Sequence, residues 1–311
     1  MDAGCEKVIV AGGHQLEKLK ETLTEAQGYL SQVFPKLSEI EIQFLREEEP
    51  LGTGGAVANA IKVAGISSPA FVMNGDILCD VDAKELWKCY ESSGGKSVIL
   101  APSVPDPRQY GLLLIEGLGA EDIVVKFIEK GEAKGKPPYS INGGAYILGS
   151  DALKSIASHI GEFSLERQIF PALAKEGKLI AKRHQGFWRD VGTLESFMKT
   201  HLDVLGVWLT EGREKFFGLR NDFALFRDFI YIHNSVALGQ GCDLFHRVVL
   251  MRECKVGSGS RLQNVVALPG AVIEDKCQLT SVLIDAHTVV SSGSILSESV
   301  ISREKVEPLI L

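Results

Sequence analysis

The chain has 311 residues, of which 45% are hydrophobic and 23% charged, and its formal net charge is −7. This length allows two ordinary domains, and the composition is that of a globular protein rather than a disordered or collagen-like one. The acidic balance and the lack of a basic block argue against a dedicated nucleic-acid binder, whose affinity would depend on many Lys and Arg contacts to phosphates.

The chain carries no pattern of secretion or membrane insertion. Its six Cys form no C-x-x-C pair and no zinc-binding spacing, which indicates reduced thiols without a catalytic role. No apolar run approaches the ~20 residues that a membrane span needs, and the first residues lack a signal-peptide pattern. We therefore expect a cytoplasmic protein with no membrane partner.

The first third alternates strand and helix patterns. Strands are expected at 7–11, 41–45, 69–74 and 97–101, and helices at 14–27, 54–63 and 82–91. Short strands separated by helices predict a largely parallel sheet with right-handed crossovers. In such sheets ligands bind at the carboxyl ends of strands, and Gly75-Asp76 falls at such an end.

The middle of the chain is richer in strands. Strands are expected at 111–116, 123–129, 143–148 and 178–182, and helices at 151–158, 164–175 and 194–205. The last of these helices is expected to close the first domain, because no clear period follows it. The predicted organisation is a domain at 1–206, a connection at 207–228 and a second domain at 229–311.

The last third contains a six-residue repeat. Bulky aliphatic side chains stand six apart, at Ile232, Leu238, Leu244, Leu250, Val256, Leu262 and Leu268. A small residue follows each of them by four positions. This pattern is the signature of the hexapeptide left-handed β-helix, a solenoid in which the aliphatic side chain fills the axis. The period slips by one at Ile273 and continues from Leu279, so about 70 residues at ~18 per coil predict roughly four coils.

Several short segments of the first domain carry groups that suit phosphate and sugar chemistry. Glycines in 49–56 would let a backbone approach a ligand closely at a helix start, although a tight turn explains them equally well. Asp76 could hold a hard divalent cation or cap the next element.

Four later side chains are similar in kind. Glu129 could accept sugar hydroxyls and Lys130 could bind a phosphate, although adjacent opposite charges are more often a solvated surface pair. Asn142 could hydrogen-bond a polyol or form a turn. Asp190 stands before a Gly-Thr helix start, where it could act as a ligand or as a cap.

In this order, the segments resemble the sugar-1-phosphate nucleotidylyltransferases, and most of all the mannose-1-phosphate guanylyltransferases (GDP-mannose pyrophosphorylases). The matching segments are 49–55, 74–76, 109–111, 127–130, 141–146, 164–167 with 170–171, and 187–193. The likeness covers nearly the whole chain. It implies an α/β, Rossmann-like nucleotidyltransferase domain followed by the hexapeptide left-handed β-helix of the longer members.

The resemblance also implies roles for individual residues. Asp76 and Asp190 would hold Mg²⁺ between them, and Lys130 would grip the sugar phosphate, which makes these three the expected catalytic residues. The expected substrate-binding residues are Glu49, Leu51, Gly52, Thr53, Gly54 and Gly55 at the nucleobase, and Tyr110, Gly111, Glu129 and Asn142 at the sugar.

The chain departs from the family's pattern at its beginning. The family's first strand runs into a Gly-rich loop with an Arg and a Pro-Lys-Pro segment, which wraps the triphosphate, and this sequence contains no such segment. We therefore expect an N-terminally truncated member whose first strand and signature loop are missing. Because losing one preorganised donor costs ~10²–10³ in rate, the sequence leaves open whether this chain is itself an active enzyme. Gly131 also replaces the family's usual Pro.

The sequence is compatible with three functions. The first is transfer of a nucleotidyl group from an NTP, with GTP as the first choice, to a sugar 1-phosphate, with mannose 1-phosphate as the first choice, releasing pyrophosphate. The second is a non-catalytic homologue that binds nucleotide-sugar and regulates a catalytic partner. The third is a hexapeptide acyltransferase that uses His233, His246 or His287 as a base. Because open solenoid ends need capping, we also expect a homo-oligomer or a complex with a related subunit.

Overall fold

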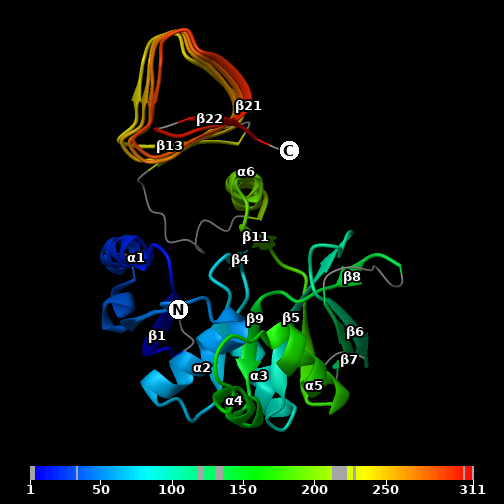
Figure 1. Ribbon diagram of the computed structural model, residues 1–311. Helices are drawn as coiled ribbons and strands as arrows, with labels where there is room; N and C mark the ends of the chain where they lie inside the picture. The colour runs from blue at the N-terminus through cyan, green and yellow to red at the C-terminus, as the bar shows by residue number, and fades with distance from the viewer. Residues whose placement is uncertain are drawn as a thin grey trace. The chain divides into compact units, whose positions relative to one another are not determined.

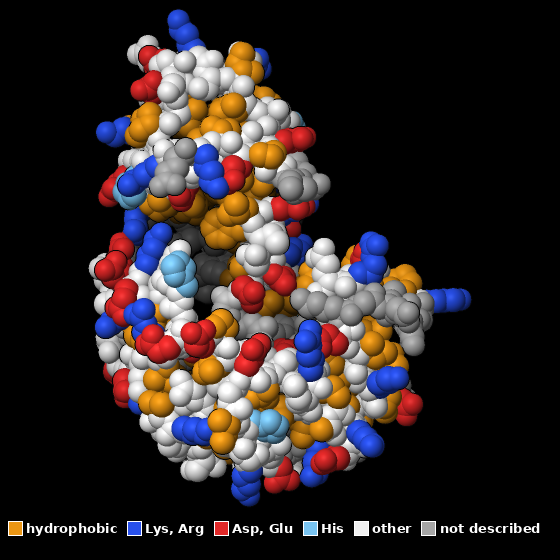
Figure 2. All heavy atoms as spheres, in the orientation of Figure 1, with side chains coloured by type: hydrophobic (Ala, Val, Ile, Leu, Met, Phe, Trp, Pro, Cys, Tyr) orange, Lys and Arg blue, Asp and Glu red, His pale blue; other side chains and the backbone are white. Residues whose placement is uncertain are grey.

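The computed structural model describes residues 4–32, 34–117, 122–129, 136–211, 223–226, 229–303 and 305–309. The chain divides into two compact units, Met1–Trp188 and Arg189–Leu311, and each is described by itself. The first is an α/β unit and the second contains the β-helix (Figure 1). On the face drawn in Figure 2, Lys and Arg side chains are interspersed with Asp and Glu, in keeping with the lack of a basic block in the sequence.

The first unit is built on a seven-stranded sheet with the order β3-β9-β5-β10-β7-β6, in which β8 pairs with β5. The strands are β3 (Ala70–Met73), β5 (Ser97–Val104), β6 (Leu112–Glu116), β7 (Ile123–Ile128), β8 (Tyr139–Ser140), β9 (Ala145–Leu148) and β10 (Leu179–His184). The sheet is mixed rather than largely parallel as predicted. The chain returns from its strand-rich middle as β9, which lies antiparallel between β3 and β5, while β5 and β10 are parallel.

Helices cover both faces of this sheet, and its central strand is buried accordingly. Along β5, Ile99 and Ala101 belong to one apolar cluster, whereas Val98 and Leu100 belong to another. The first cluster is shared with α2 (Gly52–Ala64), α4 (Ser150–Ala157), the π-helical turn η2 (Leu165–Ile169) and α5 (Phe170–Lys175); the second with α3 (Ala83–Ser92). A strand buried on both faces is continuously apolar, which is why this segment lacks alternation in the sequence.

The remaining elements of the first unit lie outside this sheet. They are β1 (Lys7–Gly12), α1 (Leu16–Ser31), η1 (Pro35–Glu39), β2 (Glu41–Arg46) and β4 (Ile77–Cys79). β1 and β2 form a separate parallel pair. Just after β4, the backbone N–H of Asp80 bonds to the carbonyl of Phe187 at 3.1 Å, next to the start of β11 (Trp188–Asp190). The sequence patterns did not predict β4, β8 or β11, which have only two or three residues each.

The predicted hexapeptide β-helix is confirmed, and its coils stack into a prism of triangular cross-section (Figure 1). One sheet contains β12 (Phe223–Phe226), β13 (Ile230–His233), β15 (Asp243–Leu250), β17 (Arg261–Ala267), β19 (Gln278–Ile284), β21 (Ile295–Ile301) and β22 (Val306–Pro308). A second contains β14 (Ala237–Leu238), β16 (Lys255–Val256), β18 (Val272–Ile273) and β20 (Val289–Val290). Equivalent leucines stack from coil to coil: Leu244 pairs with Leu262, Leu262 with Leu279, and Leu279 with Leu296.

The slip in the repeat lies one corner earlier than predicted. The pairing of β15 with β17 shifts register between Phe245 and Val248, where two left-handed residues, His246 and Arg247, stand opposite the single left-handed Asn264. As a result Ala267 lies in the axial core, and Leu268 packs against the outer cluster instead. A corner shortened by one residue shifts every later side chain by one position.

The outer face of the main β-helix sheet is apolar, and α6 (Leu194–Glu211) packs on it. Met198, Leu202 and Leu205 of this helix share a cluster with outward-facing residues of the strands, Val249, Val266, Leu283 and Val300. By its contacts the helix groups with the second unit, and the predicted domain boundary at 206 stays a prediction. No helix among the described residues is long and apolar enough to span a membrane.

Candidate functional site

The predicted nucleobase loop is hydrogen-bonded to the backbone of Phe163, just before η2. The N–H groups of Gly54 and Gly55 both donate to the carbonyl oxygen of Phe163, at 2.9 and 3.3 Å, and the N–H of Phe163 donates to Leu51 at 3.0 Å. A Cβ on Gly54 would lie 2.3 Å from the Phe163 ring, and one on Gly52 would lie 2.6 Å from the Phe163 carbonyl oxygen. The glycines therefore serve close packing here, and two N–H groups in the first turn of α2 are already bonded.

The side chain of Thr53 adds hydrogen bonds between the loop at 51–55 and η2. Its hydroxyl donates to Glu166 Oε2 at 2.5 Å and accepts from the Leu165 N–H at 3.0 Å. Ser164 also donates to Glu166 Oε2, at 2.7 Å, and its hydroxyl accepts from the backbone N–H groups of Glu166 and Arg167. The Glu166 carboxylate thus joins the loop at 51–55 to the start of the π-helical turn.

The next residue of that turn reaches the predicted sugar site. Arg167 Nε donates to Glu129 Oε2 at 3.0 Å, just after the end of β7. The Glu129 side chain is 34% exposed and that of Arg167 is 71% exposed. Lys130, the predicted phosphate ligand, lies outside the described residues. Arg167 is therefore the cation that the described part of the chain places beside Glu129.

Asn142 is held by two hydrogen bonds to its side-chain oxygen, from the Gly144 N–H at 3.0 Å and from the Tyr146 hydroxyl at 2.9 Å. Burial, followed by the negative charges of Glu166 and Asp76, raises the pKa of Tyr146 above its ordinary value. That phenol stays neutral and acts as a donor.

The predicted sugar-facing residues Tyr110 and Gly111 also lie beside Asn142. The Asn142 N–H donates to the Gly111 carbonyl oxygen at 2.8 Å, and a Cβ on Gly111 would meet the Phe127 ring at 2.7 Å. Tyr110 packs edge-on against Trp188, with ring centroids 5.4 Å apart. Close packing against Phe127 thus explains why a glycine stands at position 111. Tyr110, Gly111 and Asn142 form one cluster.

Asp76 and Asp190 are the predicted metal ligands. Asp76 is exposed in the turn after β3, and the turn is fixed by a 2.8 Å hydrogen bond from the Asn74 N–H to the Gly144 carbonyl oxygen. Asp190 ends β11 in the second unit, and its Oδ1 accepts from the Gly192 N–H at 2.8 Å. Both offer hard carboxylate oxygens, which suit Mg²⁺. Their joint binding of one ion stays a prediction.

Glu49, the remaining predicted substrate residue, is exposed in the segment before α2. The structure therefore connects the loop at 51–55 and Glu129 through η2. The sequence reasoning assigned no role to Glu166 or Arg167, although 164–167 was among the matching segments. The available signal was Ser164, an N-cap residue type at the start of the helix predicted at 164–175.

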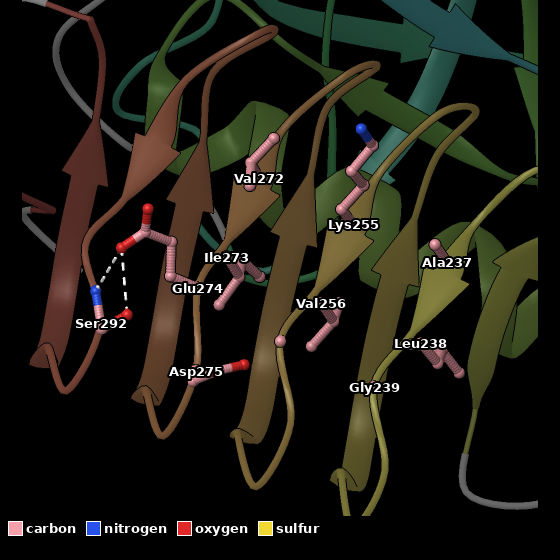
Figure 3. Close-up of a pocket in the computed structure, with 11 residues that line it drawn as sticks. Ala237, Leu238, Gly239, Lys255, Val256, Val272, Ile273, Glu274, Asp275 and Ser292 are labelled. Atoms are coloured by element: carbon pink, nitrogen blue, oxygen red, sulfur yellow. Dashed lines mark hydrogen bonds between the residues drawn. The ribbon is translucent and has the colours of Figure 1, made fainter.

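The second unit offers two shallow pockets. The larger, of about 530 Å³, lies on the β-helix and is lined by Lys255, Glu274 and Asp275 among others; Glu274 there accepts hydrogen bonds from the N–H and hydroxyl of Ser292 (Figure 3). The smaller contains His246. His233 instead bonds to the Ser235 hydroxyl through Nδ1 at 2.9 Å. His287 occupies a left-handed position near Gly270.

Comparisons with known proteins agree with this architecture. Residues 1–206 match the family model "Nucleotidyl transferase", and residues 233–304 match "GlmU-like, C-terminal hexapeptide". A relative from Oryza sativa subsp. japonica, named probable mannose-1-phosphate guanylyltransferase 3, is 30% identical over 94% of this chain and 82% of its own length. A mannose-1-phosphate guanylyltransferase of Mycobacterium tuberculosis is 33% identical over 76% of this chain and 62% of its own length.

Solved structures are similar to about two thirds of this chain. HddC from Yersinia pseudotuberculosis superimposes with a TM-score of 0.50 at 27% identity, covering 64% of this chain and 78% of that protein. A UDP-glucose pyrophosphorylase solved with UDP-glucose has a TM-score of 0.53 at 20% identity, over 63% of this chain and 80% of its own, and supports the fold alone.

Proposed function

Because the chain belongs to the nucleotidyl transferase family, as a sugar-1-phosphate nucleotidyltransferase most like the mannose-1-phosphate guanylyltransferases, we propose that it forms GDP-mannose from GTP and mannose 1-phosphate. In this reaction a phosphate oxygen of the sugar attacks the α-phosphorus of GTP, the bond to the β-phosphate breaks and pyrophosphate leaves. Such transfers depend on in-line positioning and charge neutralisation rather than on covalent chemistry by the protein.

One structural observation supports the proposal most strongly. The loop at 51–55 and Glu129 are joined by consecutive residues of one π-helical turn, Glu166 through the Thr53 hydroxyl and Arg167 through its guanidinium. Two substrates that react with each other must be bound side by side. A turn that holds both subsites would fix their separation, and π-helical turns occur frequently at functional sites.

The family uses a divalent cation, and we propose that it is Mg²⁺ in this protein. Among the described residues no group of three or more His, Cys, Asp or Glu is placed to hold a metal ion. Asp76 and Asp190 would therefore hold Mg²⁺ together with substrate phosphates, as is usual for this ion. The bound ion would supply neutralisation of phosphate charge.

The other proposed roles concern binding of the substrates. Leu51–Gly55 would contact the base with Glu49 nearby, and the cluster of Tyr110, Gly111 and Asn142 would face the sugar together with Glu129. These residues would orient the sugar so that its phosphate oxygen approaches the α-phosphorus from the side opposite the leaving pyrophosphate.

The test is pyrophosphate release from the full chain, with several NTPs and sugar 1-phosphates. We expect GTP with mannose 1-phosphate to be the best pair, and Asp190→Asn to abolish release, whereas Asp243→Asn on the β-helix surface retains it. Product release with no dependence on Asp76 and Asp190 would contradict the proposed site. Tight binding of GDP-mannose without turnover would favour the non-catalytic regulator instead.

We also propose that the chain assembles with a second copy or a related subunit. A relative from Drosophila pseudoobscura pseudoobscura, 28% identical over 98% of this chain and 79% of its own length, is named mannose-1-phosphate guanylyltransferase catalytic subunit beta. The molar mass from light scattering tests this, because a 33.8 kDa particle would contradict self-assembly.

A further inference from the structure

Arg167 is fixed at its backbone and exposed at its guanidinium. Its N–H donates to the Ser164 hydroxyl at 3.2 Å, and the neighbouring Glu166 is bonded to Thr53 and Ser164. Its side chain is 71% exposed, yet Nε is directed at Glu129 Oε2, 3.0 Å away. The backbone thus sets where the charge lies, while the guanidinium stays accessible to a ligand.

The surroundings of Arg167 are acidic, which matters for an anionic substrate. Glu129 is its ion-pair partner, and Glu166 precedes it. A sugar phosphate that approaches these carboxylates needs a cation beside them, because unscreened like charges would repel it. Arg167 supplies that charge at the Glu129 end of the cluster.

The geometry of the guanidinium allows it to serve two partners at once. A planar guanidinium presents several N–H donors on different edges, and it binds phosphate and carboxylate in a bidentate manner. Among the described residues, Arg167 bonds to Glu129 through Nε, so the edge formed by the two Nη groups can meet another oxyanion. A carboxylate also has two acceptor oxygens, so Glu129 Oε1 can accept from a hydroxyl while Oε2 holds the arginine.

We propose that Arg167 binds the phosphate of the sugar 1-phosphate through its Nη groups while Nε holds Glu129 in place to accept sugar hydroxyls. The pair would then recognise the two chemical parts of one substrate, a phosphate and an adjacent polyol. This inference rests on the proposed function for the class of substrate. It assigns a substrate contact to Arg167, which was not among the expected site residues.

Variants at Arg167 should fold normally, because exposed ion pairs contribute little to stability. Binding of mannose 1-phosphate and of GTP to the full chain is measured by titration calorimetry, alongside the melting temperature. We expect Arg167→Gln to weaken mannose 1-phosphate binding by roughly 10- to 100-fold, the loss of a charged hydrogen-bonding pair, with GTP binding unchanged. Arg167→Lys should recover part of the loss, because it keeps the charge and lacks the planar fork.

The matched control is Arg261→Gln on the β-helix, since Arg261 forms a similarly exposed pair with Asp243 at 3.2 Å. This variant should bind mannose 1-phosphate as the unmodified chain does. Unchanged binding in Arg167→Gln, or an equal loss in Arg261→Gln, would overturn the proposal. So would a failure of the unmodified chain to bind mannose 1-phosphate.

A double-mutant cycle with Glu129→Gln separates phosphate binding from mere orientation of Glu129. If Arg167 contacts the phosphate, Arg167→Gln weakens binding in the Glu129→Gln background as well. If its effect vanishes in that background, Arg167 only positions Glu129 and the proposal is wrong. Pyrophosphate release is scored separately. Arg167-dependent binding without product would leave this inference standing and reject the proposed function, and product formation with no effect of Arg167 would do the reverse.

Discussion

Tyr146 donates a hydrogen bond from its buried hydroxyl to Asn142 Oδ1 at 2.9 Å, and the Gly144 N–H donates to the same oxygen at 3.0 Å. Because a backbone N–H can only donate, this oxygen is the acceptor end of the amide, and the orientation of Asn142 is fixed. Its Nδ2 group can therefore donate to a ligand. A side chain that the sequence predicted as a polyol contact is therefore held ready as a hydrogen-bond donor.

Replacing Tyr146 with Phe removes one of the two bonds that hold Asn142. We expect KM for mannose 1-phosphate to rise about fivefold, corresponding to ~1 kcal/mol for one hydrogen bond, while KM for GTP changes little. The free energy of unfolding should fall by a similar amount, because only the hydroxyl and its hydrogen bond are lost. The ring stays in its place in the core. Steady-state kinetics and urea denaturation measure both quantities.

Tyr90→Phe on α3 is the control for this change, because Tyr90 packs against Trp87 rather than against Asn142. It should leave both KM values as they are. An equal rise in KM for both substrates in Tyr146→Phe would argue that the hydroxyl supports the whole domain and not Asn142 in particular.

Gly54 lies so close to Phe163 that no larger residue fits there. A Cβ would be 2.3 Å from the nearest ring atom, and the Gly54 N–H is bonded to the Phe163 carbonyl oxygen, so the backbone cannot withdraw freely. We expect Gly54→Ala to lower the free energy of unfolding by about 1–3 kcal/mol, as overpacking does, and to weaken GTP binding. Chemical denaturation and nucleotide titration are the measurements.

Two further variants give this prediction its controls. Gly28→Ala places the same methyl group on the exposed face of α1, where nothing lies within 4 Å, and should be neutral or stabilising by up to about 1 kcal/mol. Phe163→Leu should relieve part of the clash when combined with Gly54→Ala. If the double variant is no more stable than the sum of the single changes predicts, the ring contact is not the cause.

The sequence patterns located most of the elements of the first unit, because long apolar periods report burial directly. The strand predicted at 97–101 is β5, and the helix predicted at 54–63 lies within α2. Which strands are neighbours could not be derived in this way. β9 enters between β3 and β5 through pairings to residues far away in sequence, and nothing in its own four apolar residues indicates its position or direction.

The β-helix shows the same limit at a finer scale. Leu244 and Leu262 follow the six-residue period because every coil repeats the same axial contact. The shortened corner at Asn264 depends on one left-handed residue, which the aliphatic period does not report. In the candidate site, residue types suggested Glu129 and Asn142, but the bond from Arg167 to Glu129 joins residues 38 positions apart and required the fold.

His201 of α6 should make the second unit sensitive to acid. Burial lowers the pKa of this imidazole below its ordinary value of 6.5, against the smaller opposite effect of its Nδ1 contact with the Phe197 carbonyl oxygen at 2.8 Å. The unfolded chain then binds a proton more readily than the folded chain does. The stabilising contribution is therefore present above pH 6.5 and is lost as the pH falls through the folded-state pKa, with a slope of at most about 1.4 kcal/mol per pH unit.

His201→Gln should remove this contribution, because a glutamine does not titrate. Urea denaturation followed between pH 7.5 and 4.5 should show a smaller fall in the free energy of unfolding for this variant than for the unmodified chain. His14→Gln, at an exposed position before α1, should keep the unmodified profile. If the two variants have the same pH profile, the acid sensitivity comes from other groups, and the packing of His201 beside Phe197, with ring centroids 4.4 Å apart, does not penalise the charged imidazole.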